Sequence, residues 1–126
     1  MPPLPEDRHR PFEVLVEQAL DALPEGVRTL LANVAVVIED EPSREQLRSS
    51  GLAPDDGLYG LYEGVSPVTY GADLVPFPNK IPLFRLPLEE DFADPRELAR
   101  EVQKTVIHEL AHHAGLDEQR LHRLGF

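Results

Sequence analysis

The sequence predicts an α+β domain in which helices pack on a small mixed β-sheet. Three observations support this: an amphipathic helical pattern near the N-terminus, a short β-branched run after it, and a long helical pattern near the C-terminus. The chain has 126 residues, the length of one domain, and contains no internal repeat. We therefore expect a single domain over residues 1–126, with the proline-rich, charged residues 1–10 forming a loose arm.

The first half of the chain is expected to supply two helices and one strand. Residues 11–23 carry apolar side chains at the 3.6-residue period, which predicts an amphipathic helix. Residues 34–38 are β-branched or apolar and are bounded by polar residues, which predicts a central, buried strand. Ser43 and Gln46 have the spacing of a capping box, so a short helix should follow over residues 43–48.

Residues 49–79 are rich in glycine, proline and aspartate. Within them residues 57–63 form a plausible strand. The remainder is expected to be a long loop, which can be functional or an ordered surface excursion. Residues 80–88 predict a strand, and its two prolines place it at a sheet edge because proline cannot donate to a ladder.

The last third of the chain begins with a strong helix start. Asp94 is a cap residue, Pro95 takes the first helical position, and Glu97 follows three residues after the cap. This helix should run over residues 94–114 and end at Gly115, with a short final helix capped by Asp117.

Composition and charge exclude several functional classes. A net charge of −11 repels phosphate backbones, so we expect no nucleic-acid partner. The absence of cysteine excludes disulfides, thiolate ligands and a cysteine nucleophile. No apolar run approaches the ~20 residues that span a bilayer, and the first residues lack a signal-peptide pattern, so no membrane association and a cytoplasmic location are expected. Thirteen prolines, no cysteine and one methionine are typical of a thermophile, although a GC-rich genome gives a similar bias.

A five-residue motif in the long helix carries the candidate chemistry: His108-Glu109-Leu110-Ala111-His112. Residues four apart lie on the same helix face, so both imidazoles can reach one ion. Zinc takes nitrogen ligands in a tetrahedral array and keeps one position open for water when it is catalytic. Glu109 stands beside them, where it can act as general base on the zinc-bound water. The cofactor expected from this motif is zinc.

A third zinc ligand must come from another acid or histidine. Gly115 can reverse the chain and bring the next acidic residues under the metal. We favour Glu118 as this ligand, with Asp117 as the alternative because Asp117 already suits a helix cap. His113 points about 100° away from His112, so it is a candidate for substrate binding rather than for the same ion.

The segment His108-Glu109-Leu110-Ala111-His112-His113-Ala114-Gly115-Leu116-Asp117-Glu118 resembles the extended HExxHxxGxx(H/D) motif of metzincin-like metallopeptidases. More closely, it is similar to the minimal bacterial zincin-like proteins, which have this motif near the C-terminus. Members of that family share an upstream Gly-Leu-Tyr-Glu-Gly segment, here residues 60–64, and a strand like residues 81–88. The family usually has aspartate at the third-ligand position, whereas this chain has Glu118, and the methionine turn of true metzincins has no match.

The resemblance implies a zincin-like single domain with a long active-site helix near the C-terminus, and a zinc-dependent hydrolase of peptide or protein substrates. It also implies that an edge strand before this helix aligns an extended peptide. Here that strand is residues 80–88, so Ile81, Leu83 and Phe84 become candidate substrate contacts, together with His113. The candidates for stabilising the oxyanion are Tyr59, Tyr62, Tyr70 and His113.

Two other functions are compatible with these residues. The main alternative is a non-catalytic, metal-containing module that binds a peptide or protein at the edge strand. A small metal-dependent nuclease is disfavoured by the charge of −11 and by the acid at position 118. The sequence leaves the oligomeric state and the substrate open.

Overall fold

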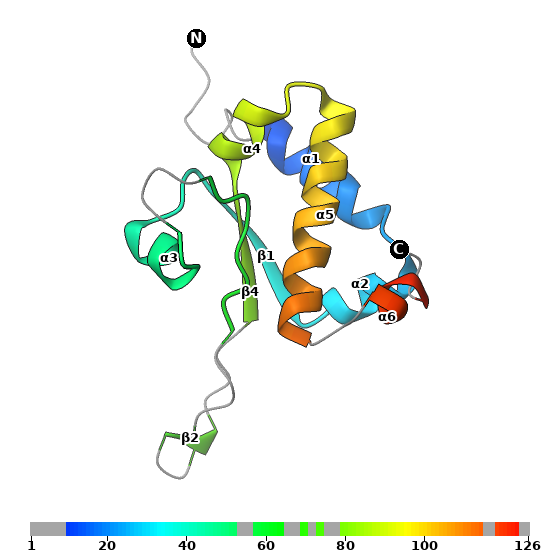
Figure 1. The fold of residues 1–126 in the computed structure, drawn as a ribbon. Helices are drawn as coiled ribbons and strands as arrows, with labels where there is room; N and C mark the ends of the chain where they lie inside the picture. The colour runs from blue at the N-terminus through cyan, green and yellow to red at the C-terminus, as the bar shows by residue number, and fades with distance from the viewer. Residues whose placement is uncertain are drawn as a thin grey trace.

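A computed structural model describes residues 10–52, 57–64, 69–70, 73–74, 79–114 and 118–123. Figure 1 shows a small sheet standing beside the long helix α5, with the shorter helices around them. In chain order the elements are α1 (Arg10–Asp21), α2 (Glu25–Leu31), β1 (Val34–Glu39), α3 (Arg44–Ser49), β2 (Thr69–Tyr70), β3 (Asp73–Leu74), β4 (Asn79–Phe84), α4 (Arg85–Asp91), α5 (Pro95–Ala114) and α6 (Glu118–Arg123). The prediction of an α+β fold is confirmed.

Strand β4 is the centre of the main sheet. On one side it pairs in parallel with β1, in a register that aligns Val34 with Asn79. On its other side it meets residues 59–63 in antiparallel orientation, with the backbone N–H of Lys80 donating to the carbonyl of Glu63 at 2.9 Å and the reverse bond at 2.8 Å. The sheet is therefore mixed, as the sequence predicts.

Pro82 interrupts the antiparallel pairing between β4 and residues 59–63. The N–H of Leu61 donates to the carbonyl of Pro82 at 3.2 Å, but proline has no N–H to return the bond. Pairing resumes at the next register position, where the N–H of Phe84 donates to the carbonyl of Tyr59 at 2.9 Å. Residues 59–63 consequently form isolated bridges rather than a continuous strand. Together with residues 57–58 they make up the flanking segment (residues 57–63).

Two sequence predictions about the sheet are wrong. Residues 80–88 do not form an edge strand, because β4 is paired on both sides and ends at Phe84. Helix α4 begins at the next residue and accommodates Pro87 in its first turn, where backbone N–H groups have no intrahelical partner. Conversely, β1 was expected to be central, yet within the described residues it pairs only with β4.

The core lies between the sheet and two helices. Helices α1 and α5 pack on each other, and their apolar faces join β4 in one cluster, whose buried members are Phe12, Val16, Ala19, Ile81, Leu83, Leu88, Leu98, Val102 and Val106. The side-chain amide of Gln103 donates to the carbonyl of Ala19 at 2.8 Å and ties α5 to α1. Dry packing of this kind fixes the position of α5 relative to the sheet.

The other predicted helices are also confirmed. Helix α1 and the long helix α5 occupy the expected ranges, and α3 has the capping box formed by Ser43 and Gln46. The long loop contains a short antiparallel pair, β2 and β3. Residues 1–9 of the expected arm, Gly115 and Asp117 lie outside the described residues. No helix among the described residues is long and apolar enough to cross a membrane.

Candidate metal and peptide site

Helix α5 turns its motif away from the core. Val102 and Val106 are fully buried and Leu110 is 6% exposed, so one stripe of the helix is committed to packing. His108 and His112 lie on the opposite stripe, and both are exposed. Because they are four residues apart, their side chains project from the same face one turn apart. The buried stripe and the two histidines therefore lie on different sides of the helix.

Glu109 occupies a different environment from the two histidines. Its side chain is half-buried, and burial raises the pKa of its carboxyl above the ordinary value, whereas the charges of His108 and His112 act to lower it. Both imidazoles therefore lie close enough to the carboxylate to influence its pKa. A carboxyl with a raised pKa holds a proton more readily than a solvated one, as a general base requires.

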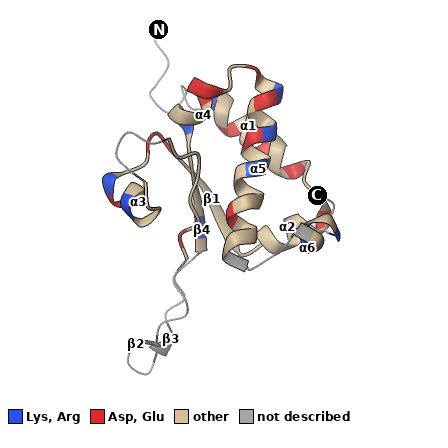
Figure 2. Ribbon diagram, viewed as in Figure 1, with Lys and Arg blue, Asp and Glu red and all other residues tan. Residues whose placement is uncertain are grey.

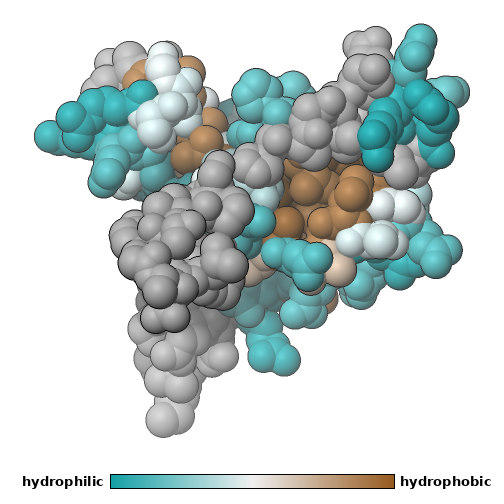
Figure 3. All heavy atoms as spheres, turned by 90° about the horizontal axis from the view of Figure 1, so that it is seen from below, coloured by the Kyte–Doolittle hydropathy of each residue, from teal (hydrophilic) through white to brown (hydrophobic). Residues whose placement is uncertain are grey.

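His108 and Glu109 of the motif line a groove of about 1230 Å³, whereas His112 is not among its lining residues. Helix α5 forms its floor, while residues 57–60 and helix α6 line its two sides; Figure 1 shows α5 between them. The lining residues are Gly57, Leu58, Tyr59, Gly60, Glu101, Lys104, Thr105, Ile107, His108, Glu109, Gln119, His122 and Arg123. Seen from below, the molecule gathers hydrophobic side chains into one area bordered by hydrophilic ones (Figure 3). The site is thus an open groove, as expected for a domain of this size.

Gly60 sets the width of the groove on the side of the flanking segment. A Cβ atom on this residue would lie 2.6 Å from Cγ2 of Thr105 and 3.2 Å from the carbonyl oxygen of Pro82. Such distances are below van der Waals contact, so the segment approaches α5 this closely only because residue 60 is glycine. The hydroxyl of Thr105 donates to the carbonyl of Glu101 at 2.7 Å, which directs the Thr105 methyl toward Gly60.

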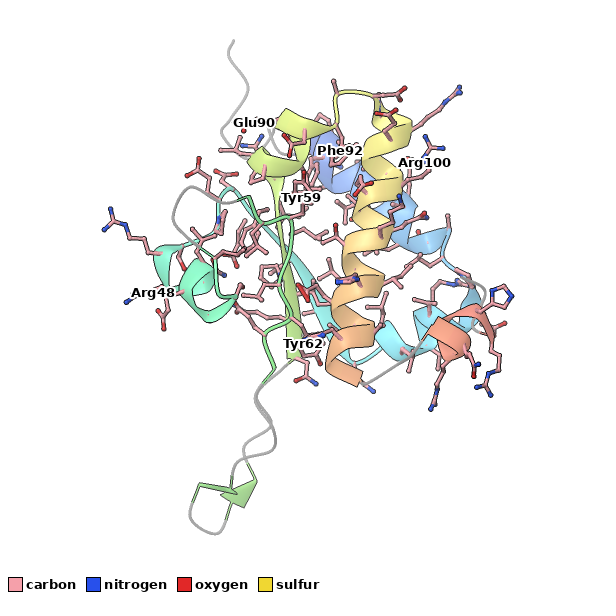
Figure 4. All side chains as sticks on the ribbon, viewed as in Figure 1. Arg48, Tyr59, Tyr62, Glu90, Phe92 and Arg100 are labelled. Carbon is pink, nitrogen blue, oxygen red and sulfur yellow. The ribbon has the colours of Figure 1, made fainter. Side chains whose placement is uncertain are left out.

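Tyr59 anchors the upper end of the flanking segment. Its hydroxyl donates to Asp91 of α4, and its ring meets Phe92 edge-on at a centroid distance of 5.5 Å (Figure 4). The hydrogen bond to Asp91 and burial together raise the pKa of Tyr59 to about 12. Because this hydroxyl is already engaged, Tyr59 is not a suitable oxyanion donor, which corrects one of the sequence candidates.

The lower end of the segment is held through Glu63. The side-chain amide of Gln46 donates to Glu63 at 2.7 Å and to Glu39 at 3.3 Å, and Lys80 forms an ion pair with Glu63 at 3.3 Å. Tethers at both ends fix the flanking segment against β4. No local pattern indicates this role of Gln46, because its capping box involves only Ser43.

Three predicted substrate contacts are wrong. Ile81, Leu83 and Phe84 have 0% exposed surface, and the backbone of β4 is paired on both sides. Ile81 and Leu83 face the core cluster, and Phe84 lies on the opposite face of the strand, which is also buried. Among the described residues, the flanking segment and not β4 is the outer element on this side of the sheet.

The remaining predicted ligands stand partly outside what the structure describes. Glu118 is the first residue of α6, but its side chain is outside the described residues, as are Asp117 and the side chain of His113. Within the described part of the chain no three acidic or histidine side chains converge on one point. Of the predicted ligands, the structure describes the side chains of His108 and His112 only, and the whole ligand set stays a prediction.

The two described ligands fit a zinc ion chemically. Both are imidazoles, and neither has a hydrogen bond or ion pair with a described residue that would hold it away from a cation. Neutral nitrogen ligands, with an acid as a possible third, form a donor set that zinc accepts. Sequence reasoning overlooked Lys104, Thr105 and Arg123, because nothing in their pattern shows that they line the same groove.

Comparison with known proteins agrees with this geometry. A family model described as zincin-like metallopeptidase matches residues 31–126, well over half of the chain. No curated protein matches the sequence. The matched range contains the sheet, the flanking segment, α5 and α6, which are the elements that build the groove. The chain therefore belongs to the zincin-like metallopeptidase family.

Proposed function

We propose that the protein is a zinc-dependent peptide hydrolase in which Glu109 is the general base. The observation that carries this proposal is the arrangement on α5. His108 and His112 are exposed on one face, the half-buried Glu109 lies beside them, and the groove runs past the motif. His108 and His112 would hold the ion, with Glu118 as the third ligand and Asp117 as the alternative.

The chemistry divides between the ion and the protein. When bound, zinc supplies Lewis-acid chemistry that makes water a nucleophile at neutral pH and polarises a peptide carbonyl. Glu109 accepts the proton of the attacking water and delivers it to the leaving amine. Its raised pKa suits both halves of that transfer, because the carboxyl must take up the proton and then release it.

The flanking segment is suited to align the substrate. Leu61 and Glu63 direct their backbone hydrogen bonds to β4, so the alternating geometry of an extended chain turns the backbone N–H and carbonyl of Gly60 the other way. Gly60 lines the groove. An extended peptide can therefore add to this edge by backbone hydrogen bonds, with its side chains alternating toward and away from α5.

A peptidase assay with zinc tests this proposal. Wild type and Glu109→Gln are compared on a mixture of quenched fluorescent peptides, and the glutamine variant is expected to lose at least about 100-fold in kcat/KM. Glu97→Gln removes the same charge from the exposed first turn of α5 and is the matched control, with activity unchanged.

Two results would contradict the hydrolase. Equal cleavage by wild type and Glu109→Gln, both loaded with zinc, excludes the general-base role. Peptide binding without turnover by zinc-loaded wild type would instead support the alternative, a non-catalytic module that binds peptides or proteins at the flanking segment.

A further inference from the structure

The groove contains basic residues that the proposed mechanism does not use. Lys104 of α5 and Arg123 of α6 both line it, next to the motif. The chain as a whole carries a charge of −11, and acidic positions occur along several helices of the ribbon in Figure 2. The groove is also lined by Glu101 and Glu109, so its lysine, arginine and glutamate charges balance, whereas the chain as a whole is strongly acidic.

Lys104 and Glu109 project from different sides of α5. Thr105 faces Gly60, so this side of α5 is turned toward the flanking segment, and Glu109 lies one turn further along the same side. Lys104 is displaced by about 100° from Thr105, to the other side of His108. Arg123 of α6 lines the same groove. Glu109 thus lies on the side of the flanking segment, whereas Lys104 lies on the other side of His108 with Glu101 as its ion-pair partner.

Lys104 remains available to a ligand. Its one ion pair within the described residues is with Glu101, one helical turn away, at 3.5 Å. The Lys104 side chain is 72% exposed, whereas that of Glu101 is 24% exposed. An exposed pair of this length contributes little and exchanges readily with another carboxylate.

We propose that the groove selects an extended peptide with an aspartate or glutamate side chain placed between Lys104 and Arg123. This proposal rests on the proposed function for the premise that the substrate lies in this groove. Leu58 and Ile107 give the groove apolar contacts for neighbouring side chains, while the two cations supply the charged contact. An arginine can meet a carboxylate in bidentate fashion and a lysine acts as a point charge, so both suit a carboxylate ligand.

Peptide binding tests the preference independently of cleavage. Pairs of fluorescein-labelled, end-capped peptides that differ only by glutamate or glutamine at one position are titrated with zinc-loaded Glu109→Gln protein, and binding is followed by anisotropy. At one position the glutamate peptide is expected to bind roughly threefold to tenfold more tightly. The preference should shrink as salt rises from 0.05 to 0.5 M, because ions screen an exposed charge pair.

Variants then locate the contact. Lys104→Gln and Arg123→Gln, each combined with Glu109→Gln, should each reduce the preference, and the two changes together should abolish it. Arg48→Gln removes the same charge from α3, on the other side of the sheet, and should leave the preference intact (Figure 4).

Two outcomes overturn this inference: equal binding of the glutamate and glutamine peptides, or a preference that survives loss of both cations. If the preference is present but wild type cleaves no peptide, the hydrolase proposal fails while the acidic-peptide proposal stands. If wild type cleaves peptides but shows no charge preference, the acidic-peptide proposal fails while the hydrolase proposal stands.

Discussion

Gly60 and Thr105 lie so close that a Cβ on Gly60 would be 2.6 Å from the Thr105 methyl. Gly60→Ala should therefore destabilise the fold by about 1–3 kcal/mol, the range for overpacking, as measured by urea denaturation. Gly57→Ala is the matched control, because a Cβ at Gly57 meets nothing within 4 Å. Its free energy of unfolding should change by less than about 0.5 kcal/mol.

A second change should rescue the first. Thr105→Ser removes the clashing methyl but keeps the hydroxyl that donates to Glu101. In a double-mutant cycle, Gly60→Ala should cost less in the Thr105→Ser background by at least about 0.5 kcal/mol. Additive effects of the two changes would mean that this contact does not set the position of the flanking segment.

Tyr59→Phe removes the hydrogen bond to Asp91 and should cost about 1 kcal/mol at pH 7 in chemical denaturation. The folded-state pKa of Tyr59 is raised from 10.0 to about 12. The stabilisation is therefore fully present below pH 10 and is lost as the pH rises through about 12. The stability difference between wild type and Tyr59→Phe should follow that course. A difference that does not change up to pH 12 would contradict the assigned hydrogen bond.

Because Ile81 is buried, a substitution there should change the free energy of unfolding but not peptide binding. Ile81→Val should cost about 0.5–1.5 kcal/mol of unfolding free energy, because it removes one buried methylene group from the core. Its KM for a cleaved peptide should equal that of wild type. A raised KM with unchanged stability would restore the sequence-based assignment of β4 as a substrate-binding strand.

The choice between Glu118 and Asp117 as third ligand can be made by metal affinity. Glu118→Gln should weaken zinc binding by about 100-fold or more, since changes that only affect the partners of ligands already cost 10- to 100-fold. Asp117→Asn keeps the capping ability of the residue and should leave zinc affinity nearly unchanged. If Asp117→Asn weakens zinc binding more than Glu118→Gln does, Asp117 and not Glu118 is the third ligand. Competition with a chromogenic zinc chelator measures both.

Local patterns predict α1, α3, α5 and the motif because the responsible residues are neighbours in sequence, whereas α2 and α4 are not predicted. The amphipathic period of α1, the capping box of α3 and the start of α5 all act within a few residues. The same holds for His108 and His112, whose common face follows from helix geometry alone.

Strand order, by contrast, depends on contacts between distant residues. Proline lacks a backbone N–H, so Pro82 alone indicates an edge strand. In the fold, β4 is nevertheless paired on both sides, because Pro82 costs it only one of the two backbone hydrogen bonds that it would share with Leu61 of the flanking segment. The opposing walls of the groove, formed by residues 57–60 and α6, likewise come together only in the fold. For this reason the basic pair of Lys104 and Arg123 has no signature in the sequence.

Zinc stoichiometry tests the central claim most directly. Protein purified without chelator is dialysed against zinc-free buffer and its metal content is measured by mass spectrometry. Wild type is expected to hold about one zinc per chain, and His108→Ala and His112→Ala almost none. His9→Ala, which removes a histidine outside the motif, should retain the metal. Equal zinc content in wild type and the two motif variants would contradict a metal site on α5.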